Sequence, residues 1–321
     1  MFARLVAHLR ACRSLCYDRG YVAYLCLAAW VLYYIAVPMV FAHSTLAGLA
    51  VAVFPGAYIG IWAIYLMHEC WHRYFAGIDN RTLFVMFCCV LFTQPNAYSH
   101  GHRSHHKLVN TYADLEIHPI GRIERRIPRA LYNSLSFVFG SLFLLFFGLG
   151  QAGSDAQDES AFNDKFIPLA WVGAWASIAT LSHWVTGAAW SEIAISYLLS
   201  IWVTSFVHRH NEMIEHGGVI ADGDLGFRVS KTRNLAPRGI LSNLFLFLVH
   251  QDSREHTLHH SQPSENWRPR WLPSTRLPSN AVYITLSEYA RLVLRMMWGH
   301  ESPELVQRST GALKVEGSCK R

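Results

Sequence analysis

Three internal clusters of histidine are the residues of this sequence best suited to chemistry. The chain contains 18 histidines, and eight of them form one H-x3-H motif and two H-x2-H-H motifs: His68 and His72; His102, His105 and His106; His256, His259 and His260. On a helix, residues three or four positions apart share one face, so each cluster can direct its imidazoles toward one point. Eight nitrogen ligands exceed the four that close a tetrahedral zinc site. The spacing therefore predicts two metal ions that share these histidines.

The groups that orient such ligands can also be sought in the sequence. Imidazole does not select the metal, because iron, copper, zinc and nickel all accept it. A ligating imidazole usually donates its second ring N–H to a carboxylate or carbonyl, which fixes the ring orientation. Polar residues close to the clusters are placed for this role: Glu69, Asp114, Glu212, Glu215, Asp252, Glu255 and His210. We expect no catalytic residue beyond the metal centre itself.

The composition predicts that these clusters belong to a membrane protein. Apolar residues make up 52% of the 321 residues and charged residues only 16%, against about 25% in soluble proteins. The net charge of +6 is not gathered on a soluble module, so we expect membrane lipid as a partner and no nucleic acid. The seven cysteines include no C-x2-C pair and are expected to be reduced thiols.

Four apolar segments are predicted to cross the membrane as two hairpins. A crossing helix needs about 20 apolar residues, and the segments are Tyr21–Phe41 with Leu46–Met67, and Leu169–Gly187 with Ser191–Val207. Several arginines precede the first segment, so the positive-inside rule places residues 1–20 in the cytoplasm. The histidine clusters and a cap formed by residues 208–321 then lie on that same side. We expect an integral, multi-pass protein of the bacterial inner membrane or the endoplasmic reticulum.

Three further apolar segments are predicted to lie at the membrane surface. Leu131–Leu149 is expected in the interface, because an even number of crossings keeps all three histidine clusters on one side. Leu83–Phe92 is too short to cross, and Tyr283–Trp298 has the apolar spacing of a surface helix. The sequence thus predicts one all-α polytopic membrane domain over residues 1–321, with a cytoplasmic cap rich in histidine.

The order and spacing of the histidine motifs resemble those of the integral-membrane fatty acid desaturase superfamily, which includes hydroxylases and related enzymes. The resemblance runs from about residue 45 to residue 275. Glu215-His216-Gly217-Gly218 is similar to the segment that supplies a further ligand in this family, so the resemblance implies His216 as a ninth ligand. It also implies two non-haem iron ions, O2 as co-substrate, and electrons from a ferredoxin or a cytochrome b5 with its reductase.

A metal centre at the membrane surface can meet a fatty acyl chain, supplied as a free acid, a thioester or a lipid. Cleaving a C–H bond of a saturated chain requires a redox metal and O2, because no acid or base at neutral pH removes such a proton. We therefore expect a fatty acyl desaturase. A hydroxylase, or an oxidative decarboxylase that forms a terminal alkene, would use the same histidines. A membrane haem or metal-binding protein is the alternative of a different class, although a transporter would need polar groups at mid-membrane depth.

Overall fold

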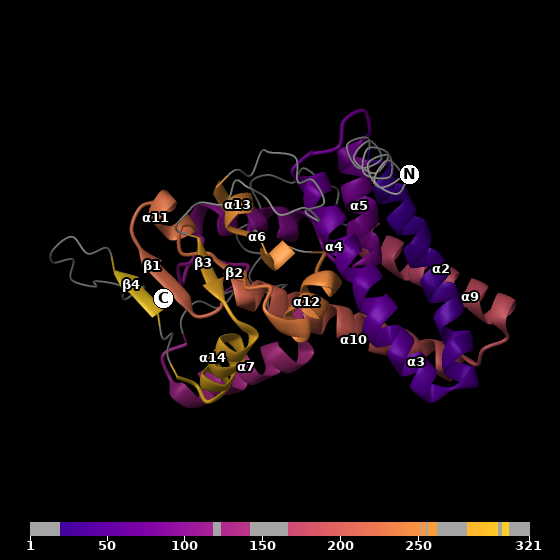
Figure 1. The fold of residues 1–321 in the computed structure, drawn as a ribbon. Helices are drawn as coiled ribbons and strands as arrows, with labels where there is room; N and C mark the ends of the chain where they lie inside the picture. The colour runs from indigo at the N-terminus through magenta and orange to yellow at the C-terminus, as the bar shows by residue number, and fades with distance from the viewer. Residues whose placement is uncertain are drawn as a thin grey trace, which may run out of the picture.

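The computed structural model describes residues 20–117, 123–141, 166–250, 252–254, 256–261, 281–300 and 304–307. Figure 1 shows that helices dominate these residues, with short strands gathered at the side away from the N-terminal helices. The longer helices are α2 (Tyr21–His43), α3 (Thr45–Val51), α4 (Ala57–Trp71), α5 (Asn80–Val90), α6 (Pro95–Leu108), α7 (Arg126–Phe139), α9 (Ile167–Thr186), α10 (Trp190–Glu215), α12 (Gly239–Leu248) and α14 (Leu286–Met297). The shorter ones are η1 (Ala52–Gly56), α11 (Leu225–Val229), η4 (Asp252–Arg254) and α13 (His256–Ser261).

Three helices among the described residues are long and apolar enough to cross a membrane. They are Tyr21–His43, Thr45–Trp71 and Trp190–Glu215. The second runs through α3, η1 and α4 without a break. Pro55 has no N–H to donate to the preceding turn, and the helix widens there into the π-helical η1. The prediction of an apolar, mostly helical membrane protein is therefore confirmed at this level.

The remaining predicted span, Leu169–Gly187, is occupied by α9, which packs against α2. Aromatic rings join these helices to α10. Trp175 of α9 lies edge-on to Trp30 and Tyr34 of α2, at 4.8 Å between ring centroids in both pairs. The hydroxyl of Tyr197 on α10 donates to the carbonyl of Tyr34 at 2.7 Å. The crossing of the membrane by α9 stays a prediction.

The predicted surface segments differ in extent from the helices observed. In the region of Leu131–Leu149, α7 begins earlier, at Arg126, and ends at Phe139, where Gly140 adopts a positive φ of 67°. Residues 142–149 lie outside the described residues. In the region of Tyr283–Trp298, α14 begins only at Leu286, where the Thr285 hydroxyl accepts from the amide of Glu288 and caps the helix.

The predicted surface helix Leu83–Phe92 corresponds to α5, which begins earlier, at Asn80. The Asp79 carboxylate caps its first turn by accepting from the amides of Arg81 and Thr82. Leu83, Phe84 and Phe87 are buried, and the helix packs against α4 and α9. One face of α5 is therefore part of the helical bundle.

The described residues include four short strands, which the expectation of an all-α fold omitted. β1 (Val219–Asp222) pairs in parallel with β4 (Glu304–Gln307), and β2 (Arg233–Leu235) pairs in parallel with β3 (Val282–Ile284). Each strand has only three or four residues, too few to give an alternating pattern in the sequence. Both sheets join the segment after α10 to later parts of the chain. The single-domain assignment of residues 1–321 stays a prediction.

Candidate metal centre

Four helices bring the predicted histidine ligands together. His68 lies in the last turn of α4 and His72 at its C-cap, while α6 carries His102, His105 and His106. His216 is the C-cap of α10, and α13 carries His256, His259 and His260. The helical spacing of each motif places its rings on the side that faces the other helices. Segments far apart in the sequence therefore meet at one centre.

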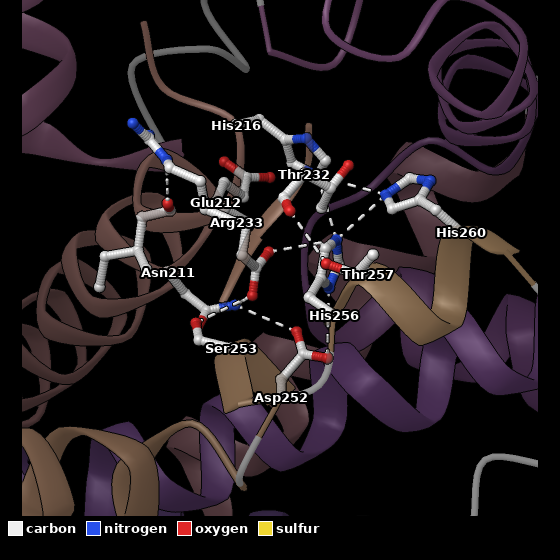
Figure 2. A network of polar contacts seen from close by, with 12 residues as sticks. Asn211, Glu212, His216, Thr232, Arg233, Asp252, Ser253, His256, Thr257 and His260 are labelled. Atoms are coloured by element: carbon white, nitrogen blue, oxygen red, sulfur yellow. Dashed lines mark hydrogen bonds and ion pairs between the residues drawn. The ribbon is translucent and has the colours of Figure 1, made fainter. Parts of the chain in front are cut away.

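The nine imidazoles are divided into two groups. One group holds five, from His68, His72, His102, His106 and His259, and the other holds four, from His105, His216, His256 and His260. Within each group, one potential ligand atom of every residue lies within 4.8 Å of those of all the others. Figure 2 shows His216, His256 and His260 of the four-histidine group together.

Distances between ring nitrogens match those of ligands around a common ion. In the four-histidine group, the Nε2 atoms of His216 and His256 are 3.0 Å apart, and those of His105 and His260 are 3.2 Å apart. In the five-histidine group, His102 Nε2 is 3.2 Å from that of His72 and 3.1 Å from that of His106. Two nitrogens that are each about 2.0–2.1 Å from one ion lie about 2.9–3.4 Å apart at octahedral to tetrahedral angles. Both groups therefore have the donor atoms and the spacing of a metal site.

The opposite ring nitrogens of three histidines are held by polar side chains from one segment. The Nδ1 atom of His105 is 2.7 Å from Asp114, and that of His102 is 3.0 Å from Glu116. The Nδ1 atom of His216 is 3.0 Å from the side-chain oxygen of Asn110. Donation from Nδ1–H to these oxygens leaves the lone pair of Nε2 free to face the centre. Asp114 was predicted for this role, whereas Asn110 and Glu116 were not.

His256 has a carboxylate beside each of its ring nitrogens. Its Nδ1 is 3.5 Å from Asp252, and its Nε2 is 3.3 Å from Glu215. The amide of Asn211 donates to both carboxylates, at 2.9 Å to Glu215 and 3.1 Å to Asp252. The Ser253 hydroxyl donates to Glu215 at 2.9 Å. Glu215 and Asp252, both predicted to orient ligands, thus form a buried polar network at the edge of the four-histidine group.

Strand β2 stabilises the C-terminal end of α10 beside the four-histidine group. The last carbonyls of a helix have no partner within it, and here the buried guanidinium of Arg233 donates to the carbonyls of Met213, Ile214 and Gly217. The neighbouring Asn234 accepts from the amide of Thr257 in α13 at 3.1 Å. The same strand therefore holds both the segment that carries His216 and the helix of the third motif.

Burial lowers the pKa of most of these histidines. It lowers the pKa of His72 to about 4, and with neighbouring histidines it lowers that of His106 to about 3. The pKa values of His102, His259 and His260 are also shifted well below the usual range by burial and by nearby imidazoles. Burial acts to lower the pKa of His105 as well, but the carboxylates of Asp114 and Glu116 raise it to about 9. Neutral imidazoles are the form that binds metal ions.

Other residues predicted to orient ligands are placed differently. Glu212 is 3.1 Å from Arg209 and 3.6 Å from His208. His210 is 2.6 Å from the Tyr289 hydroxyl through Nδ1, and its Nε2 is 3.2 Å from the Phe137 carbonyl. Both residues therefore bond to groups outside the nine histidines. Glu69 is fully buried on α4, next to His68 in the chain, and Glu255 lies outside the described residues.

Comparison with known proteins identifies one family. Residues 44–298 match the family model described as fatty acid desaturase. The matched region is well over half of the chain, and it contains all three histidine motifs and His216. No curated protein matches the sequence, and no solved structure matches it either.

Proposed function

The chain belongs to the fatty acid desaturase family, and from this premise we propose that it is a membrane diiron oxidoreductase that desaturates a fatty acyl chain. It would use O2 and two electrons from an external donor. The observation that carries the proposal is the division of nine buried or half-buried imidazoles into adjacent groups of five and four. Nitrogen ligands in that number exceed the need of a single ion and suit two.

The residues present fit two iron ions. We propose that His68, His72, His102, His106 and His259 hold one ion, and that His105, His216, His256 and His260 hold the other. Once bound, the irons supply the activation of O2 that removing two hydrogens from an unactivated chain requires. No residue outside the metal centre is assigned a catalytic role.

Polar side chains around the histidines are suited to orient the imidazole rings and to hold a proton. Asp114, Glu116 and Asn110 accept from the Nδ1 atoms of His105, His102 and His216, and this fixes the tautomer that presents Nε2 to the metal. Reducing O2 fully to water while the chain loses two hydrogens consumes two electrons and two protons. The buried carboxylates of Glu215 and Asp252, linked by Asn211, are suited to hold a proton beside the four-histidine group.

We further propose that α2 with the α3–α4 helix, and α9 with α10, cross the membrane as two hairpins. The distribution of histidines supports this, since the ends of α4 and α10 both carry them. The metal centre would then lie at the cytoplasmic surface, where a fatty acyl chain can extend from it toward the lipid. This arrangement keeps the reacting carbon near the irons and the rest of the chain in an apolar environment.

The electrons would come from a ferredoxin or from a cytochrome b5 with its reductase. Arg103 and Lys107 are exposed on α6, the helix of the second motif, and the Arg228 guanidinium donates to the Lys107 carbonyl at 3.0 Å. This basic group is suited to a donor with an acidic surface, because complementary charge speeds association.

Product analysis tests the proposed reaction. The full chain would be produced in a host that is fed deuterium-labelled fatty acids, and the acyl products would be identified by mass spectrometry. Loss of two hydrogens with a new double bond is the expected result. An added oxygen would instead show a hydroxylase, and a terminal alkene shortened by one carbon would show a decarboxylase. An intense Soret band in the purified protein would contradict the non-haem centre.

A further inference from the structure

Helix α12 has an apolar face that is largely exposed in the part of the chain that the structure describes. Its sequence, GILSNLFLFL, contains no charged residue. Ile240 is 86% exposed, Leu241 72% and Phe247 51%, and Leu244 is exposed on the same side. The opposite side is buried through Ser242 and Leu246. A row of large exposed apolar side chains on one helix indicates an apolar partner.

The contacts of α12 place it beside the middle of a candidate membrane span. The Phe247 ring stacks on that of Tyr58 at 4.9 Å between centroids, and the His250 ring donates from Nε2 to the Tyr58 carbonyl at 2.9 Å. Val249 is fully buried in a cluster with Ala57 and Ile61. These three partners belong to α4, in the middle of the 27-residue helix Thr45–Trp71. Figure 1 shows α12 alongside α4.

Tyr58 lies at hydrocarbon depth wherever this helix is placed in a bilayer. A crossing takes about 20 residues, and any such window within Thr45–Trp71 leaves Tyr58 at least about six residues, or roughly 9 Å, from either end. Phe247 lies at the same depth because its ring is stacked on Tyr58. Leu244 is one helical turn earlier, about 4.5 Å along the axis, and remains inside the apolar layer.

We propose that α12 is embedded in the bilayer that α4 crosses, and that lipid acyl chains cover its exposed face. The ten residues of α12 span about 15 Å, half of the hydrocarbon thickness, so the chain enters and leaves on the same side. Helical hydrogen bonds satisfy the backbone at that depth, and the Asn243 amide donates to the Gly239 carbonyl at 2.8 Å. Arg238, which precedes the helix and is exposed, marks the entry at the polar surface.

This helix leads directly to the third histidine motif. His250 lies at the same depth as Tyr58, to whose carbonyl it is hydrogen-bonded. Further along the chain, α13 lies at the C-terminal end of α4, where the His259 ring is 4.6 Å from that of His68. The segment after α10 is therefore not uniformly a cytoplasmic cap. One part of it is anchored in lipid, and that part positions the ligands of α13. The inference rests on the membrane placement within the proposed function and on none of its metal chemistry.

Site-directed spin labelling of the full chain in lipid vesicles tests the inference. Leu244→Cys and Phe247→Cys would carry the nitroxide on α12. Leu32→Cys, at a 64% exposed position of α2, gives the lipid reference, and Asp222→Cys, at an exposed position of β1, gives the aqueous reference. The unmutated chain, labelled in parallel, gives the signal of its own cysteines for subtraction.

The measurement is the ratio of collision rates of the nitroxide with O2 and with a water-soluble nickel chelate. Both α12 labels are expected to match Leu32→Cys, with O2 favoured, and to differ strongly from Asp222→Cys. Ratios like that of Asp222→Cys at both α12 positions would overturn the inference while leaving the span α2 in place. If Leu32→Cys also reported water, the membrane placement itself would fail together with the inference. Leu244→Cys alone decides the matter if Phe247→Cys disturbs the packing on Tyr58.

Discussion

His105 and His259 belong to different groups of the metal centre, which makes their roles separable. We expect the purified protein to hold about two irons per chain, one for each group. His259→Ala should lower the iron affinity of the five-histidine group, and His105→Ala that of the four-histidine group. Each loss should be at least the roughly 10–100-fold that removing an orienting partner costs. Elemental analysis of the two variants, combined with Mössbauer spectra of the iron that remains, would show different residual sites. Full iron content and activity in either variant would remove that histidine from the ligand set.

His216, at the C-cap of α10, and His210, within α10, provide a matched comparison of a proposed ligand with a nearby histidine that is not one. His216 faces His256 and His260 with its Nε2 atom, at 3.0 Å and 3.2 Å, whereas His210 bonds to Tyr289 and to the Phe137 carbonyl. His216→Ala should therefore lose iron as severely as a change within a motif, and His210→Ala should retain it. Glu212→Gln should also retain iron, since this carboxylate pairs with Arg209. Iron analysis that found His210 essential and His216 dispensable would reverse the assignment.

Arg233 is expected to be a positioning residue for His216. Replacing its buried guanidinium by an apolar side chain removes the Arg233 donor from the carbonyls of Met213, Ile214 and Gly217. Met213 keeps the Gly217 amide as a donor, and each buried carbonyl left unsatisfied costs about 1–3 kcal/mol. Arg233→Met should lower the melting temperature and reduce iron in the four-histidine group, while Arg233→Lys should recover part of both. Arg125→Met, at an exposed position before α7, serves as the control. Equal melting temperatures for Arg233→Met and Arg125→Met would contradict this role.

The residues that hold the histidines were harder to predict than the histidines. The motifs repeat at helical spacing, so the sequence alone predicts which rings can converge. Asn110 and Glu116 follow α6 in an irregular segment, and Asn110 has a positive φ of 59°. Their partners depend on how this turn folds back over α6 and meets α10, and no short-range pattern encodes that path. Arg233 was missed as a ligand-positioning group for the same reason, since its three acceptors lie at the end of another element.

At the level of elements, the packing of α4 on α10 sets the distance between the first motif and His216. Gly60 of α4 lies against Thr204 of α10, and a Cβ atom at Gly60 would overlap the Thr204 side chain. Small residues allow such close approach between membrane helices. Gly60→Leu should therefore destabilise the protein by about 1–3 kcal/mol through overpacking.

Gly173 of α9 provides the control for that change, because a Cβ atom there meets nothing within 4 Å. Gly173→Leu makes the same gain in helix propensity without the overlap. Thermal unfolding in detergent should show a lower melting temperature for Gly60→Leu and no decrease for Gly173→Leu. A decrease of the same size in both variants would show that the α4–α10 contact is not responsible.

The long apolar helices could be predicted from the sequence, whereas the short strands and the short helix α12 could not. The ranges Tyr21–Phe41 and Leu46–Met67 fall within α2 and the α3–α4 helix, because about 20 consecutive apolar residues leave few alternatives. Strand β3 lies at the start of a segment whose apolar spacing suits a helix. Its pairing with β2 is a tertiary contact that overrides the local pattern. The short apolar run that became α12 gave no periodic signal strong enough to predict its place beside α4.

For the whole molecule, the direction of each span gives a prediction about topology. Reporter tags at the N-terminus, near residue 112 and at the C-terminus should all be found in the cytoplasm. A tag at Ser44, between α2 and α3, should be found on the opposite side. Protease protection in sealed vesicles would distinguish these outcomes. A tag near residue 158 tests whether α9 and α10 form the second hairpin, since an external location there would require a different number of crossings.

The division of the nine histidines among four helices also bears on how the protein is made. His68 and His72 leave the ribosome long before His256, His259 and His260, and domains fold progressively during synthesis. Neither group of imidazoles is complete until α13 has been made, after α10. Under the proposed function, the nascent chain would insert its first helices into the membrane with incomplete sets of iron ligands. Iron would then be acquired late in biogenesis, and a shortage of iron would leave inserted but inactive protein.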